Sequence, residues 1–115
     1  MSNLLTDNTM NEQVKVIYLA GKFHSNNLQN FPRTIDHLDD KIKFVLVDCS
    51  NLTFMDSSGL GTLVLSFKKL QGTERKMILC SVKDEVKLLL ELTGMDRVFE
   101  IISSQEEFTQ QFLGF

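Results

Sequence analysis

Cysteine is scarce in this sequence, which has only Cys49 and Cys80 among its 115 residues. The two have no C-x-x-C spacing and are too few for a disulfide framework, so a disulfide-rich scaffold is not indicated. Each stands at the end of an apolar segment, where a free cysteine usually behaves as a small buried hydrophobe. A functional disulfide between them is the less favoured alternative.

Long apolar runs and an excess of basic residues are also missing. No stretch approaches the roughly 18 apolar residues of a membrane span, and residues 1–13 lack the basic-then-apolar pattern of a signal peptide. Lys and Arg number 12 against 15 Asp and Glu, which gives a net charge of −3 and no surplus for neutralising phosphates. We therefore expect a cytoplasmic protein that neither binds nucleic acid nor inserts into a membrane.

Common catalytic and cofactor-binding motifs are absent as well. There is no GxxxxGK[ST] phosphate loop and no GxSxG elbow, and Gly59 and Gly61 lack the third glycine of GxGxxG. The only histidines, His24 and His37, are not spaced from other residues as metal ligands are. The sequence therefore predicts no metal site, no bound cofactor and no autonomous enzyme.

What the sequence does contain is the patterning of one α/β domain. Its 43% apolar and 23% charged residues are ordinary globular values, and 115 residues suit a single core. Strand-like apolar segments alternate with segments whose apolar residues recur about every three or four positions. The predicted strands are residues 13–20, 44–47, 76–82 and 97–102, and the predicted helices are residues 25–40, 57–71, 84–94 and 104–113. The first dozen residues either add an edge strand or stay irregular. This order predicts a mostly parallel sheet of four or five strands with about four helices packed on it.

Some boundaries follow from single residues. Gly21 ends the first predicted strand, and Asp48 ends the second, with a loop through residues 49–55. Pro32 would cost about 3 kcal/mol in a helix interior but is tolerated in the first turn. We therefore expect that helix to begin late, with Asn30 as its cap.

Residues 56–61, DSSGLG, join the predicted loop to the next helix. A helix N-terminus presents N–H groups without partners and a partial positive charge, so it favours an anion. Gly59 and Gly61 each cost about 1 kcal/mol relative to alanine, which suggests that something approaches the backbone closely. A phosphoryl group on Ser57 would fit this setting, although no base for Ser57 is evident. The alternative is an ordinary N-cap by Asp56 or a serine, which needs no ligand.

The longer segment from Asp48 to Gly61 resembles the signature of the STAS domain, in particular that of bacterial anti-sigma-factor antagonists. In that pattern an apolar strand ends in Asp and a short loop leads to FMDSSGLG, here residues 54–61. Residues 19–23, LAGKF, and 85–101, EVKLLLELTGMDRVFEI, resemble two other segments of the family. The resemblance implies a single STAS domain over residues 1–115.

A partner switch is what this resemblance implies for function. Unphosphorylated antagonists bind an anti-sigma factor that is also a serine kinase, the kinase phosphorylates the first serine of the motif with ATP, and a phosphatase resets the switch. Carried over, this makes Ser57 the phosphoacceptor, while ATP and its metal belong to the kinase. The surrounding partner-binding positions are then His24, Met55, Asp56, Ser58, Gly59, Leu60 and Gly61.

His24 departs from the family pattern, which commonly has an acid after Gly-x-Leu. It is either a surface residue or a group that helps to hold a phosphoserine. Two other functions stay open: an accessory STAS subunit of a transporter or another signalling complex without a phosphoswitch, and, less favoured, a serine-dependent enzyme.

Overall fold

One five-stranded sheet runs through the computed structural model, which describes residues 5–24 and 28–114. The strands are β1 (Leu5–Asn11), β2 (Val14–Phe23), β3 (Phe44–Met55), β4 (Lys76–Cys80) and β5 (Glu100–Ile102), and they lie in the sheet in this order. β1 is antiparallel to β2 and the other neighbours are parallel. The predicted mostly parallel sheet is confirmed, and the N-terminal segment supplies an edge strand.

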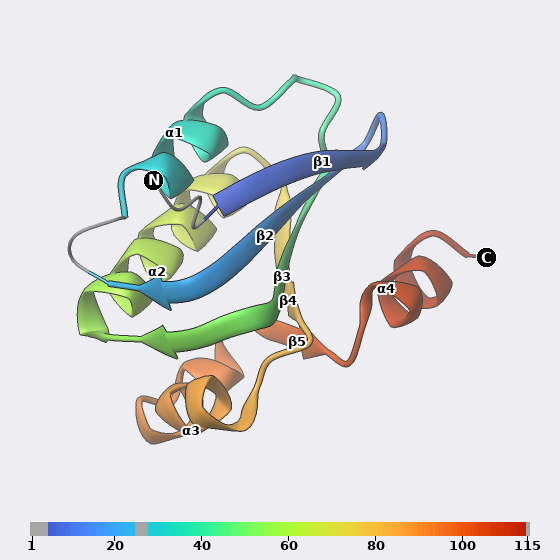
Figure 1. Cartoon of the computed structure of the whole chain (residues 1–115). Coiled ribbons are helices and arrows are strands. Elements are labelled where there is room, and N and C mark those ends of the chain that lie inside the picture. Colours follow the sequence, from blue (N-terminus) through green and yellow to red (C-terminus); the bar gives the residue numbers. More distant parts are fainter. Residues whose placement is uncertain (1–4, 25–27, 115) are drawn as a thin grey trace.

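Helices cover both faces of this sheet (Figure 1). Apolar residues of α1 (Asn30–Asp36), α2 (Ser57–Gly72) and α3 (Asp84–Leu92) pack on one face, and α4 (Gln105–Phe112) packs on the other. Because both faces are covered, strand residues of either orientation are buried, for example Val45 and Val47 on one side and Leu46 on the other. This explains the unbroken apolar run at the start of β3.

The two cysteines illustrate the same two-sided burial. Cys49 lies in the core beneath α1, α2 and α3, whereas Cys80 lies in the core beneath α4, and both are free thiols. Burial raises the pKa of both, that of Cys80 to about 12. They act as buried hydrophobes, as expected.

β3 does not end at Asp48, so the predicted loop over residues 49–55 is wrong. The strand continues to Met55, and its second half pairs with β2 alone. Two register shifts against β2 each insert one extra residue into β3. Leu52 and Met55 therefore both face the core although they are three positions apart, while Phe54 is left 47% exposed. A strand with this interrupted alternation resembles a loop in sequence.

Other boundaries also differ from the predictions. Gly21 does not end β2 but lies within it with φ of +75°, next to one of the register shifts. The first helix does begin late, but Gln29 is its cap and Asn30 its first residue, which puts Pro32 in the first turn. Residues 25–27 of that predicted helix lie outside the described residues. The last predicted strand, residues 97–102, begins only at Glu100, and Arg97 instead ends a short 3₁₀ helix, η1 (Met95–Arg97).

Candidate functional site

The site begins at Asp56, the single residue between β3 and α2. Its backbone is extended, and its carboxylate accepts a hydrogen bond from the Gly59 N–H at 2.9 Å. Asp56 is therefore the N-cap, which settles the choice between Asp56 and a serine. Ser57 and Ser58 are the first two residues of α2, and both are exposed.

Gly59 holds the first turn of α2 against the ends of β2 and β3. A Cβ atom at this position would lie 2.3 Å from the Phe23 carbonyl oxygen and 2.9 Å from Met55 Cγ. No side chain fits there without a shift of the backbone. A close approach to this glycine was predicted, but it is made by the protein's own strands and not by a ligand.

Gly61 has the opposite surroundings. A Cβ atom at this position would meet no atom within 4 Å. A glycine inside a helix costs about 1 kcal/mol relative to alanine, and no contact within the described chain requires this one. Any close approach at Gly61 therefore comes from outside the described residues.

An open hollow of about 410 Å³ lies beside Gly61, between the first half of α2 and the segment that follows α3. Its lining residues carry no charge: Ser57, Leu60, Gly61, Val64, Leu65, Thr93 and Met95. Exposed leucines continue this apolar character, since Leu65 is 70% exposed and Leu92, which precedes Thr93, is 76% exposed. Exposed apolar surface of this kind is typical of a protein–protein contact.

The hydroxyl of Ser57 faces solvent at the rim of this hollow. Among the residues that the structure describes, it has no hydrogen-bond partner, so no base activates it. His37 is occupied elsewhere, with Nδ1 2.8 Å from the Arg33 carbonyl oxygen. The arrangement gives no support to a serine-dependent enzyme, whereas an exposed hydroxyl at a helix N-terminus suits modification by another enzyme.

His24 directly follows Phe23, which packs against Gly59 in the first turn of α2. Ser57 borders Thr93 and Met95. His24 is partly buried, and its contact with a phosphoserine stays a prediction.

The other predicted positions are brought together around the start of α2. Met55 and Gly59 are buried against β2, Leu60 and Gly61 border the hollow, and Ser58 is exposed. Thr93, Met95 and Leu65 were missed. Thr93 and Met95 are distant from Ser57 in sequence, so no local pattern connects them with it. Leu65 lies outside the apolar face of its helix, and only its exposure in the structure identifies it as part of this surface.

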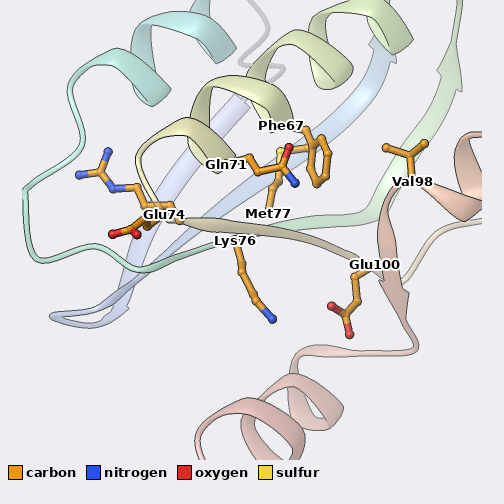
Figure 2. A pocket seen from close by; sticks show the side chains of 8 residues that line it. Phe67, Gln71, Glu74, Lys76, Met77, Val98 and Glu100 are labelled. Atoms are coloured by element: carbon orange, nitrogen blue, oxygen red, sulfur yellow. The ribbon is translucent and has the colours of Figure 1, made fainter.

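A second cleft, of about 400 Å³, lies toward the other end of α2 (Figure 2). It contains none of the predicted site residues, and its lining comes from Phe67, Gln71, Glu74, Arg75, Lys76, Met77, Val98 and Glu100. The Arg75 guanidinium donates to the carbonyl oxygens of Ile42 and Asp39 at 2.9 and 3.0 Å, so it tethers the connection before β3. This cleft is separate from the surface around Ser57.

Comparisons of the sequence and of the structure with known proteins agree on one family. A family model described as STAS domain matches residues 6–108. An anti-sigma-B factor antagonist of Listeria monocytogenes is 28% identical over 92 residues, which cover 79% of this chain and 81% of that protein.

Two solved structures share the fold at 17% identity. The anti-sigma factor antagonist SpoIIAA in its unphosphorylated form has a TM-score of 0.75, covering 96% of this chain and 99% of that one. The Bacillus cell fate determinant SpoIIAA in the phosphorylated form has a TM-score of 0.73, covering 92% and 97%. Within residues 5–24 and 28–114, none of the helices combines the length and apolarity that crossing a bilayer requires.

Proposed function

Because the chain belongs to the STAS domain family, we propose that it is an anti-sigma-factor antagonist, a regulator that acts by binding a partner. One observation carries this proposal: Ser57 is exposed at the first position of α2, on the rim of a hollow without charged side chains. In the unphosphorylated state this surface binds an anti-sigma factor that is also a serine kinase. The kinase phosphorylates Ser57 in the cytoplasm, with its own ATP and metal, and a phosphatase reverses the reaction.

Electrostatics explain why phosphorylation would release the partner. A phosphoryl group adds about −1.5 to −2 charges, next to the Asp56 carboxylate and beside an uncharged hollow. A partner fitted to the neutral hydroxyl would have to desolvate this dianion, which is costly without a paired cation. The fold itself tolerates the modification, because the N-terminus of α2 favours negative charge. The switch therefore acts on binding and leaves the fold intact.

Names of relatives support the antagonist over the transporter alternative. The Listeria monocytogenes protein, which matches most of both chains, is named an anti-sigma-B factor antagonist. SpoIIAA, which shares the fold, has been solved in phosphorylated and unphosphorylated forms. An anti-sigma factor as the partner is therefore better supported by these names than a transporter is.

The direct test uses a purified anti-sigma-factor serine kinase from the organism that encodes this chain. The protein is incubated with that kinase and ATP, and the modified residue is mapped by mass spectrometry. We expect one phosphate on Ser57, none on Ser58, and no modification of Ser57→Ala. Absence of phosphate on Ser57 together with absence of binding to the kinase would refute the proposal.

Gly61→Ala should separate binding from stability. The added methyl group has space in the free protein, so we expect helix α2 to gain about 0.5–1 kcal/mol. The same group stands where the partner would approach, so affinity for the kinase should fall about tenfold. Calorimetric titration and thermal denaturation measure the two effects.

Gly72→Ala is the matched control for this substitution. Gly72 also has no atom within 4 Å of an added Cβ, but it lies at the far end of α2. Its affinity for the kinase should equal that of the wild type. Equal affinities of Gly61→Ala and the wild type would contradict an interface at this hollow.

A further inference from the structure

Helix α4 stands apart from the other helices, on the opposite face of the sheet (Figure 1). Its hydrogen bonds and ring contacts outside its own segment go to strand residues: Met10, Tyr18, Phe44, Asp48 and Lys76. Phe108 is its one fully buried side chain, set among apolar residues of the sheet. These contacts therefore dock α4 on the sheet.

A buried carboxylate lies beneath the start of α4. Asp48 is only 6% exposed. Its Oδ1 accepts hydrogen bonds from the Ser50 N–H at 2.9 Å and the Ser50 hydroxyl at 2.6 Å. Its Oδ2 accepts one from Gln105 Nε2 at 2.8 Å, and the same amide nitrogen lies 3.2 Å from the Tyr18 hydroxyl. Gln105 is thus the group from α4 that satisfies Asp48.

The rest of the α4 contact is apolar and aromatic. Phe108 and Phe112 pack edge-on against Phe44, and the Lys76 ammonium lies 5.9 Å from the Phe112 ring centroid. Figure 2 shows the Lys76 side chain pointing toward α4 and away from Phe67 and Gln71. Apolar contacts of this kind are non-directional, whereas the Gln105–Asp48 hydrogen bond fixes one position. Without Gln105, a buried charged oxygen would lose a donor.

We propose that the hydrogen bond between Gln105 and Asp48, called the catch below, holds α4 on the sheet. When this bond is lost, α4 detaches as a unit while the rest of the domain stays folded. An eight-residue helix is not stable in water by itself, so α4 unfolds when it leaves the sheet. Opening uncovers apolar residues of β2, β3 and β4, including Val16, Leu46 and Ile78. Because α2 packs on the other face, the surface around Ser57 stays in place. This device is independent of the phosphoswitch.

Two variants that add or move a negative charge between positions 48 and 105 test the proposal by hydrogen–deuterium exchange. Gln105→Glu places a second carboxylate against Asp48, and the double variant Asp48→Asn/Gln105→Glu restores an amide–carboxylate pair with the roles exchanged. A carboxylate this close to Asp48 raises the pKa of one of the two groups, so the comparison is made at about pH 8–9, where both ionise. There we expect amides of residues 105–112 to exchange about tenfold or more faster in Gln105→Glu than in the wild type, a change of about 1.4 kcal/mol in opening. Amides of α2 should change by less than about twofold, and the double variant should regain protection of α4.

Three outcomes would overturn the proposal: unchanged protection of α4 in Gln105→Glu, equal loss of protection in α2 and α4, or no recovery in the double variant. A measurement on the wild type covers the case in which Gln105→Glu fails to fold. In low concentrations of denaturant, α4 amides should exchange through an opening that leaves α2 protected. Opening of α4 only together with α2 would refute the device.

Acid should weaken the same catch. Burial by itself raises the pKa of Asp48, but hydrogen bonds from Ser50, Gln105 and the Cys80 thiol outweigh it, so the pKa is lowered. The stabilisation from Asp48 is then complete above the ordinary carboxyl pKa and is lost as pH falls through the lower, folded-state pKa.

A measurement at low pH must separate Asp48 from the other titratable groups near the start of α4. The Tyr18 hydroxyl faces Gln105 from β2, and the Cys80 thiol faces Asp48 from β4. Burial raises the pKa of Cys80 to about 12, so this thiol stays protonated in the acid range. Glu107 has a pKa lowered by the hydrogen bond from the Ser103 N–H, so it contributes with the same sign. In Glu107→Gln the protection of α4 should still fall with acid, and Asp48→Asn should flatten that fall. An unchanged acid profile in Asp48→Asn would contradict the catch.

Discussion

Gly59→Ala is expected to lower the free energy of unfolding by about 3 kcal/mol or more. The new Cβ would stand 2.3 Å from the Phe23 carbonyl oxygen, and this end of β2 is held by β3, where Phe23 pairs with Met55. The first turn of α2 must therefore move away from the strands, which disturbs the Asp56 cap as well. Denaturant unfolding should show the loss directly, and the thermal midpoint should fall by about 10–15 °C.

Gly61→Ala is the control, because it makes the same chemical change two residues along the same helix. It should raise the thermal midpoint slightly, since an added Cβ there has space. If the two variants were equally stable, the contact between α2 and the end of β2 would not be as close as the structure shows. The opposite signs of the two effects distinguish a glycine needed by the fold from one that the fold does not need.

Ser57→Glu should lower the affinity for the anti-sigma kinase by at least about 100-fold. A carboxylate at the rim of the uncharged hollow would have to be buried without a partner charge. Ser57→Ala should bind within about threefold of the wild type, because the hydroxyl has no hydrogen-bond partner among the described residues. Surface plasmon resonance against the immobilised kinase, with nucleotide held constant, gives both affinities.

Gln110→Glu adds the same charge on the exposed side of α4, on the other face of the sheet. Its affinity should match that of the wild type, which separates a local effect from one of net charge. Binding of Ser57→Glu as tight as that of Ser57→Ala would place the interface elsewhere. All variants should keep the wild-type circular dichroism spectrum, since the N-terminus of a helix tolerates an acid.

Much of the fold could be predicted because its signals are local. The apolar run at the start of β3 requires cover on both faces of the sheet, and the structure has it. The family resemblance based on the segment from Asp48 to Gly61 is confirmed by the family model over residues 6–108. The roles of Ser57 and the phosphatase, and the absence of cofactor and enzymatic activity, stay predictions that the experiments above address.

Local patterns failed where distant segments decide the conformation. The second half of β3 was predicted as a loop because two bulges interrupt its alternation, and those bulges exist only in the pairing with β2. Gly59 and Gly61 look equivalent in sequence, yet one packs on Phe23 and the other faces open space. Gln105 and Asp48 are 57 positions apart, and no spacing rule connects them.

The sequence by itself therefore determined the class of fold, the family and a helix that begins near Ser57 or Ser58. Each of these depends on the periodicity or identity of neighbouring residues, which the chain carries before it folds. Only the tertiary structure decided that Gly59 serves the fold, that Thr93 and Met95 complete the hollow beside Ser57, and that Asp48 lies beneath α4. The physical reason is that burial and close contact depend on which surfaces meet after folding, and distant segments choose those surfaces together.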